Sequence, residues 1–120
     1  MKTIFAISAA CLLAACAVPP DGQDFNSFRE DCIAASDTAL DAAKVMMTGA
    51  PNWKVWDAMK PALDAKPERT SHLHYAAVRF TLELRHDPLY TRNKTFLNCL
   101  AGDFNQATHS PNRIKRSPAP

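Results

Sequence analysis

The sequence predicts a small all-α domain of three to four helices, stapled by one disulfide. Apolar residues recur every three or four positions through most of residues 24–105, which is the spacing of one helix face. Strand signals are few, because apolar and polar residues rarely alternate and no hairpin turn pair is present. The chain has 120 residues, enough for one domain and too few for a dinucleotide-binding fold or a (β/α)8 barrel.

Residues 1–15 have the pattern of an export signal. Lys2 gives a basic start, and the apolar run that follows is shorter than the ~20 residues needed to cross a bilayer as a helix. The run ends in small residues, as a cleaved signal peptide does. One hypothesis is ordinary cleavage after Ala17, which would release a soluble protein beginning at Val18.

The end of this segment, Leu13-Ala14-Ala15-Cys16, resembles the lipobox of bacterial lipoproteins. The resemblance implies that Cys16 receives fatty acids, becomes the first mature residue and anchors the protein in a membrane. In Gram-negative members of this class, Asp after the cysteine favours the inner membrane. Here that residue is Ala17, which implies the outer membrane, facing the periplasm.

The remaining cysteines form an even pair. Once Cys11 leaves with the signal and Cys16 carries lipid, Cys32 and Cys99 remain, and such a pair in an exported chain indicates a disulfide. The bridge would close a loop of about 68 residues, for which the chain-entropy model gives roughly 4 kcal/mol. The alternative is two buried free thiols.

After Cys16, residues 17–23 are expected to form a short tether. The first helix then covers residues 24–47, with this apolar face: Phe25, Phe28, Cys32, Ala35, Ala39, Ala43 and Met46. Two N-terminal caps fit: Ser27 with Glu30 at the spacing of a capping box, or Asp24 one turn earlier. Gly49 is a natural stop.

A second, shorter helix is expected over residues 52–65. One side of it carries these residues: Trp53, Trp56, Met59 and Leu63. Because Pro61 lies inside the segment, a break or kink is expected near Lys60.

The third helix is expected to start under a Thr70-Ser71 cap and to run to about His86, where Asp87-Pro88 ends it. Its stripe is Leu73, Ala76, Ala77, Phe80 and Leu84, widened by Tyr75, Val78 and Leu82.

The fourth helix is predicted from Thr91 to Asn105, with Gly102 weakening its later part. Its apolar face would comprise Phe96, Leu97, Leu100 and Phe104, with Cys99 nearby. Residues 106–120 are expected to form a disordered basic tail that carries Arg113, Lys115 and Arg116.

Charge divides unevenly along the chain. Residues 21–68 hold nine acidic and five basic groups, a net charge of −4, whereas residues 69–120 hold three acidic and eight basic groups, a net charge of +5. The two signs could complement one another between helices of one bundle. Alternatively, the basic half could face anionic lipid, lipopolysaccharide or an acidic partner.

No motif predicts an enzyme, a cofactor, a metal site or a small-molecule substrate. His72 and His74 diverge by about 200° on a helix and are interpreted as surface or boundary residues. Cys32 and Cys99 lack the C-x-x-C form of redox proteins, and three isolated glycines make no phosphate loop. A charged fraction of 22% is ordinary for a globular protein, and no nucleic acid partner is expected.

Trp53 and Trp56 are the leading candidates for partner binding. They either pack on the helical core, or one faces outward near Pro61 and anchors a partner, as tryptophan often does at interfaces. Tyr90 and Arg92 could belong to the same or to another contact surface.

These features predict a non-enzymatic interaction module, anchored through Cys16 and bound to another envelope protein. It would be an accessory subunit of an envelope machine, or a protective immunity or exclusion protein that blocks an incoming factor. The alternative is a module that binds lipid or peptidoglycan through its basic half.

Overall fold

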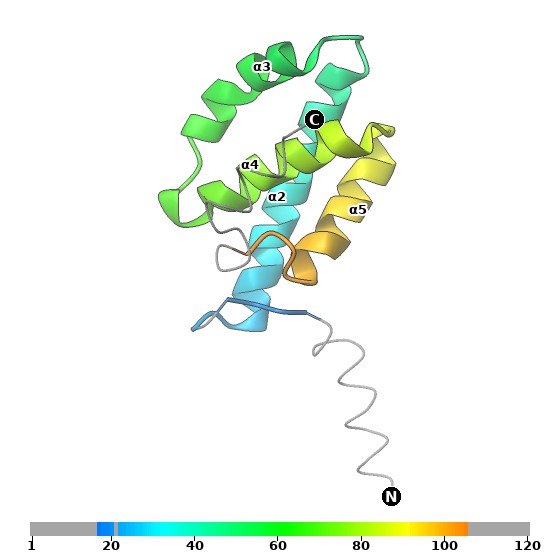
Figure 1. Ribbon diagram of the computed structural model, residues 1–120. Helices are drawn as coiled ribbons and strands as arrows, with labels where there is room; N and C mark the ends of the chain where they lie inside the picture. The colour runs from blue at the N-terminus through cyan, green and yellow to red at the C-terminus, as the bar shows by residue number, and fades with distance from the viewer. Residues whose placement is uncertain (1–16, 21, 106–120) are drawn as a thin grey trace, which may run out of the picture.

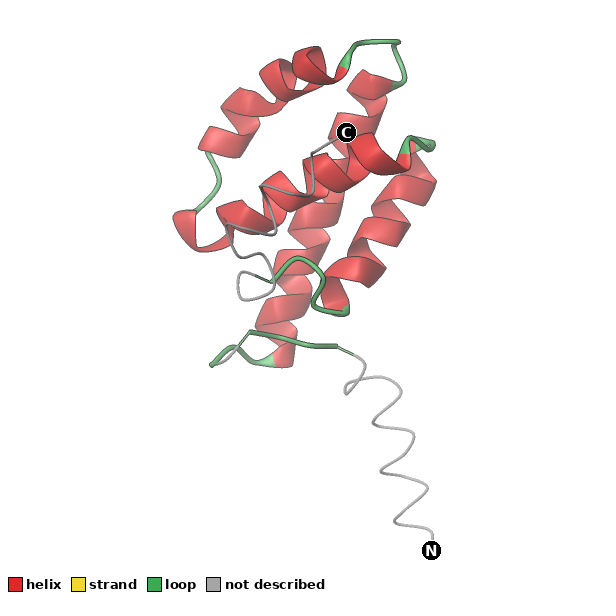
Figure 2. Cartoon of the chain, in the orientation of Figure 1, coloured by secondary structure: helices red, strands yellow, loops and turns green. Residues whose placement is uncertain are grey.

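The computed structural model describes residues 17–20 and 22–105, and within them the chain forms four helices and no strand (Figures 1 and 2). The helices are α2 (Phe25–Met46), α3 (Asn52–Asp64), α4 (Glu68–Leu84) and α5 (Pro88–Leu100). The long α2 runs through the molecule and packs against the other three, most extensively against α5 and α4. The prediction of a small all-α domain of three to four helices is confirmed, and the described residues form four.

The start of α2 follows the second of the two expected caps. The backbone N–H of Ser27 donates to Oδ1 of Asp24 at 2.7 Å, so Asp24 caps the helix and Ser27 lies within its first turn. The helix ends at Met46, and Gly49 adopts a φ of +90° shortly afterwards. Glycine takes this left-handed conformation at little cost, which explains the stop at this position.

Of the break or kink expected near Lys60, the break is absent, because α3 continues through Pro61 to Asp64. Proline lacks an N–H, which leaves the carbonyl one turn earlier, at Asp57, without its helical donor. Both residues are exposed, so water reaches that carbonyl. Beyond the proline, the N–H of Ala65 donates to the carbonyl of Pro61 at 3.2 Å, and the helix is completed normally.

The start of α4 differs from the expected Thr70-Ser71 cap. The helix begins at Glu68, directly after Pro67, and both hydroxyl residues lie inside its first turn. There Thr70 and Ser71 donate back to the carbonyls of Pro67 and Glu68.

The fourth helix lies earlier than the predicted range from Thr91 to Asn105, because α5 starts at Pro88 and ends at Leu100. Asp87 caps it by accepting the N–H of Tyr90 at 2.9 Å. Pro88 occupies the first turn, where an N–H is not needed. Leu97 was expected on the buried face, but 59% of its surface is exposed.

The core has two parts, both built on α2. One part joins α2 to α4 and α5 around Phe28, Cys32, Leu73 and Cys99, and Phe104 closes it from the turn after α5. The other joins α2 to α3 and α4 through Ala42, Met46, Val55, Met59, Leu63, Val78 and Leu82. Alanines on α2 are fully buried in both parts. Their small side chains let neighbouring helices approach α2 closely.

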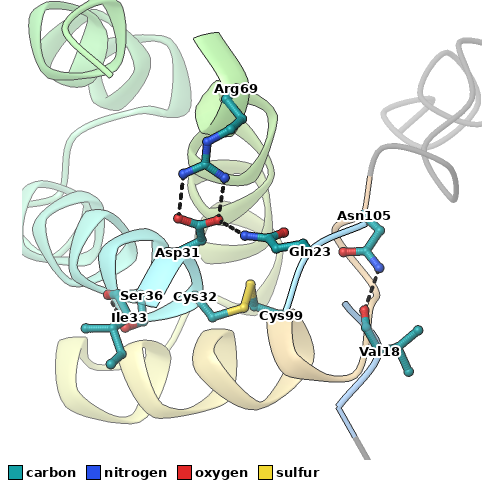
Figure 3. The surroundings of a disulfide bond; sticks show 9 residues. All are labelled: Val18, Gln23, Asp31, Cys32, Ile33, Ser36, Arg69, Cys99 and Asn105. Atoms are coloured by element: carbon teal, nitrogen blue, oxygen red, sulfur yellow. Dashed lines mark hydrogen bonds and ion pairs between the residues drawn. A yellow bond between two sulfur atoms is a disulfide. The ribbon is translucent and has the colours of Figure 1, made fainter. Parts of the chain in front are cut away.

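The predicted disulfide between Cys32 and Cys99 is confirmed. Its sulfur atoms lie 2.09 Å apart, and it joins the N-terminal half of α2 to the last turn of α5 (Figure 3). Both cysteines are fully buried in the first part of the core. The bridge therefore fixes the helix pair with the most extensive contact in the molecule.

Residues 17–20, expected to begin a tether, lie against the domain. The N–H of Val18 donates to the carbonyl of Leu100 at 2.7 Å, and the side-chain amide of Asn105 donates to the carbonyl of Val18 at 2.7 Å. Figure 3 shows this second bond beside the disulfide. Ala17 is buried. The first described residues are therefore attached to the C-terminal end of α5.

Candidate partner-binding surface

An aromatic surface lies across α3 and α4. Trp53, in the first turn of α3, exposes 67% of its surface, and Tyr75 of α4 exposes 43%. Between them Trp56 is half-buried, and its ring stacks on that of Tyr75 with 6.0 Å between centroids and 24° between planes. We use the name aromatic surface for Trp53, Trp56 and Tyr75.

The aromatic surface lines a hollow of about 310 Å³. Lys60 and Asp57 add one charge of each sign to it, and Leu63 contributes an apolar wall. Such a hollow offers an incoming side chain a stacking face and an ionic partner together. It is therefore suited to docking a protein surface that carries aromatic and charged groups.

The burial pattern of α3 explains why Trp53 faces outward. The buried stripe is Val55, Met59 and Leu63, at spacings of four residues. Trp53 precedes Val55 by two residues, which turns it roughly 200° away from the stripe at about 100° per residue. Trp56 follows Val55 by one residue and therefore lies at the edge of the stripe. The expectation that Trp53 shares a side with Met59 and Leu63 is wrong.

The structure does not bring Tyr90 or Arg92 to the hollow beside Trp53 and Trp56. Tyr90 lies at the start of α5, where its ring packs on that of His86 with 4.0 Å between centroids. His86 in turn contacts Asp87, with 2.9 Å between Nδ1 and Oδ2. This arrangement organises the α4–α5 connection, and the half-buried Arg92 lies in the next turn.

A second hollow, of about 520 Å³, lies between the N-terminal segment and the first turns of α2 and α4. Sequence reasoning missed its central group, an ion pair. Arg69 donates to both carboxylate oxygens of Asp31, at 2.8 and 3.1 Å, and the side chain of Gln23 donates to the same carboxylate (Figure 3). Burial alone would raise the pKa of Asp31, but the hydrogen bonds from Arg69 and Gln23 outweigh it and lower that pKa.

The Asp31–Arg69 pair joins the acidic half of the chain to the basic half. The uneven charge distribution was the signal that could have indicated it, and this pair agrees with complementarity between helices. Because the two charges neutralise one another, the hollow presents a satisfied ion pair. It therefore makes a weaker candidate for ligand binding than the aromatic surface.

His74 was expected at the surface or boundary, and this is wrong. Only 2% of its surface is exposed, and its Nδ1 lies 2.6 Å from Oγ1 of Thr38 on α2. Burial, with a smaller contribution from the positive charge of Lys66, lowers the pKa of His74 to about 4. The ring is thus neutral at physiological pH and forms a buried polar contact between α4 and α2. His72, two positions away, is half-buried and lines the second hollow, so the two rings diverge as expected.

Within residues 17–20 and 22–105, no group of three or more potential ligands is arranged to hold a metal ion. The four helices of this part of the chain also lack the combination of length and apolar character required to cross a membrane. Two sets of candidate residues lie outside the described residues. They are the lipidation candidate, Cys16, and the basic residues of the expected tail, Arg113, Lys115 and Arg116.

Comparisons of the chain with protein-family models, with curated proteins and with solved structures find no match.

Proposed function

We propose that this protein is a lipid-anchored component of a bacterial envelope that binds another envelope protein through the aromatic surface. The lipobox sequence supports an anchor at Cys16 in the outer membrane, facing the periplasm. The buried Cys32–Cys99 disulfide is consistent with an oxidising compartment of this kind. The role is binding, without catalysis.

The observation that carries the binding proposal is the exposure of Trp53. A tryptophan two-thirds exposed on a helix leaves a large apolar area in water, and burial of such an area is a main source of binding energy at interfaces. The neighbouring stack of Trp56 on Tyr75 fixes a flat ring surface beside it. A partner thus meets a preformed patch, and little ordering is needed on binding.

Two roles fit this proposal. An accessory subunit of an envelope machine would use the patch to attach to the rest of its assembly. A protective immunity or exclusion protein would use it to cover a functional surface of an incoming factor. The alternative of a lipid- or peptidoglycan-binding module relied partly on the basic tail, and that tail lies outside the described residues.

Binding is tested with the Trp53→Ala variant. A photoreactive side chain at Lys54, next to the patch, is crosslinked in intact cells, and the adduct is identified by mass spectrometry. Trp53→Ala should remove the adduct and raise the Kd for the identified partner by roughly 30-fold, the value for an interface hot spot of about 2 kcal/mol. The thermal unfolding midpoint should remain nearly unchanged, because Trp53 contributes little to the core.

Met47→Ala is the matched control, because it removes an exposed apolar side chain that lies outside both the aromatic surface and α5. It should leave the adduct and the Kd unchanged. Equal loss in both variants, or no loss in either, would contradict binding at the aromatic surface. The anchor is tested separately, since Cys16→Ser should abolish fatty-acid labelling, and labelling that persists would exclude the lipobox assignment.

A further inference from the structure

The solvent-facing side of α5 is unusually apolar. Leu89 and Leu97, eight residues apart, expose 61% and 59% of their surfaces, and Tyr90 between them is also exposed. Asn93 and Lys94 complete this side. We use the name α5 face for these five residues, all of which belong to the exposed class and lie along one helix.

The charge of α5 has one sign. Its thirteen residues include Arg92 and Lys94 and no carboxylate. The nearest acidic groups along the chain, Asp87 and Asp103, lie just outside the two ends of the helix. A helix with exposed leucines, a tyrosine and basic side chains has the composition of segments that lie in the interface of an anionic membrane.

The N-terminal segment connects the α5 face to the proposed anchor. Val18 is hydrogen-bonded to the carbonyl of Leu100, in the same last turn of α5 that contains Leu97. Val18 is itself exposed, and it follows Cys16 by only two residues in the sequence. Ala17, which lies between Cys16 and Val18 in the sequence, is itself buried. The proposed anchor is therefore joined to the domain without a free linker.

We propose that the α5 face rests on the lipid bilayer in which Cys16 is anchored, an inference that depends on the lipid anchor of the proposed function. Short attachment at Val18 brings the C-terminal end of α5 to the membrane surface. Leu97, Leu89 and Tyr90 then enter the headgroup region, while Lys94 and Arg92 interact with anionic lipid. The contact need not be strong alone, because the anchor supplies a high local concentration of bilayer.

This orientation leaves the aromatic surface free for a partner. Figure 1 places α5 and most of α3 on different sides of α2. With α5 on the bilayer, α3 and the part of the aromatic surface that it carries would lie away from the lipid. The domain would then present its partner-binding patch to the periplasm while its opposite side is covered by lipid.

The two native tryptophans make the orientation measurable. The full chain is purified from membranes and placed in vesicles of phosphatidylethanolamine and phosphatidylglycerol, with or without brominated acyl chains that quench nearby indoles. In the wild type, emission from Trp53 and Trp56 should be equal in both vesicles. Leu97→Trp and Leu89→Trp should each add an emission component, shifted to shorter wavelength, that brominated lipid quenches.

The matched control is Lys54→Trp, which places an extra indole at an exposed position of α3. It should add emission that brominated lipid does not quench. Equal quenching of Leu97→Trp and Lys54→Trp would overturn the proposal, because the domain would then have no preferred side on the membrane. No quenching in either would also overturn it, because the α5 face would then lie away from the acyl chains.

Fatty-acid labelling of the same preparations separates this proposal from the anchor on which it rests. Labelled protein without quenching at position 97 removes the membrane contact and leaves the anchor intact. Absence of the fatty-acid label excludes the anchor. In that case the unlabelled protein is mixed with the same vesicles, and quenching is measured again. Quenching of Leu97→Trp under those conditions supports the contact alone, and its absence excludes the contact as well.

Discussion

His74 shows how a residue with catalytic potential serves packing in this domain. It lies on α4 with its ring enclosed against α2, and its Nδ1 makes a short polar contact with Oγ1 of Thr38. Enclosure disfavours the charged imidazolium, and Lys66 repels it further, so the pKa falls to about 4. The histidine is therefore a neutral structural residue at physiological pH, and it makes the stability of the fold sensitive to acid.

The sign of that dependence follows from the two pKa values. His74 titrates near 6.5 in the unfolded chain and near 4 in the folded one, so the unfolded state binds a proton first. Stability should be constant above about pH 6.5 and fall between pH 6.5 and 4, by at most about 3 kcal/mol. The pKa values of Asp31 and Asp87 lie below the ordinary 3.8. Protonation of these two carboxyls therefore lowers the stability further, at a lower pH than protonation of His74 does.

Urea unfolding of the His74→Leu variant at pH 7 and pH 4.5 measures this contribution. In the variant, the free energy of unfolding should differ much less between the two pH values than in the wild type, since no imidazole remains at position 74 to be protonated. Thr38 keeps a hydrogen bond in the variant, because its hydroxyl also donates to the carbonyl of Ala34. His86→Gln, at an exposed position, is the control and should keep the wild-type difference. An unchanged difference in His74→Leu would contradict the assignment.

The disulfide and Trp53 show what the sequence could and could not predict at this scale. Cys32 and Cys99 were identified as a bridge by counting, because few alternatives remain once the N-terminal cysteines are assigned. The direction of Trp53 could not be predicted, because stripes through Trp53 or through Val55 both reach Met59 and Leu63 at helical spacing. Only the packing of α3 on α2 and α4 decides between them.

At the scale of elements, α3 is the helix whose intrinsic preference conflicts most with its structure. Proline within a helix costs about 3 kcal/mol relative to alanine, and Pro61 lies well inside α3. The helix persists because Val55, Met59 and Leu63 bury one side of it on both flanks of the proline. Burial on α2 and α4 therefore outweighs the local penalty, which is why the predicted break is absent.

Replacing Pro61 by alanine should stabilise the domain. The gain is about 3 kcal/mol in the helix, reduced by up to about 1 kcal/mol because alanine leaves the unfolded chain more flexible. We therefore expect the free energy of unfolding to rise by roughly 2 kcal/mol in urea titrations. A fall in stability would mean that the proline ring has a packing role at its exposed position.

Lys60→Ala is the control for Pro61→Ala. It alters the adjacent exposed residue and removes only the exposed ion pair with Asp64, whose atoms are 3.5 Å apart. The expected change is within about 0.5 kcal/mol.

At the scale of the whole molecule, the helices were predictable and their ends were less so. The 3.6-residue periodicity of the apolar residues indicated each of the four helices in residues 22–105, because each buries one face. The attachment of Val18 to Leu100 and Asn105 was not predictable, since it depends on two hydrogen bonds between distant parts of the chain and has no periodic signal. A Pro-Pro and Asp-Gly sequence indicates a connecting segment and does not specify what that segment contacts.

The attachment of the N-terminal segment determines how firmly an anchor at Cys16 would orient the domain. A substitution at Gly102 tests this attachment, because Gly102 lies against Val18. An added Cβ at Gly102 would lie 2.9 Å from Cβ of Val18, closer than real side chains approach. Gly102→Ala should therefore displace Val18 in addition to straining a backbone with φ of +87°. Gly49→Ala is the matched control, because its φ is +90° and no atom lies within 4 Å of the added carbon.

Both alanine variants should lose about 1–2 kcal/mol from the left-handed backbone alone. Gly102→Ala should lose more in urea titrations, and the excess measures the contact with Val18. Limited proteolysis should cut the segment before α2 faster in Gly102→Ala than in the wild type, and at the wild-type rate in Gly49→Ala. Equal stability and equal cleavage in the two variants would mean that Val18 is held only by its two hydrogen bonds. In that case the domain would keep its orientation to the anchor in both variants.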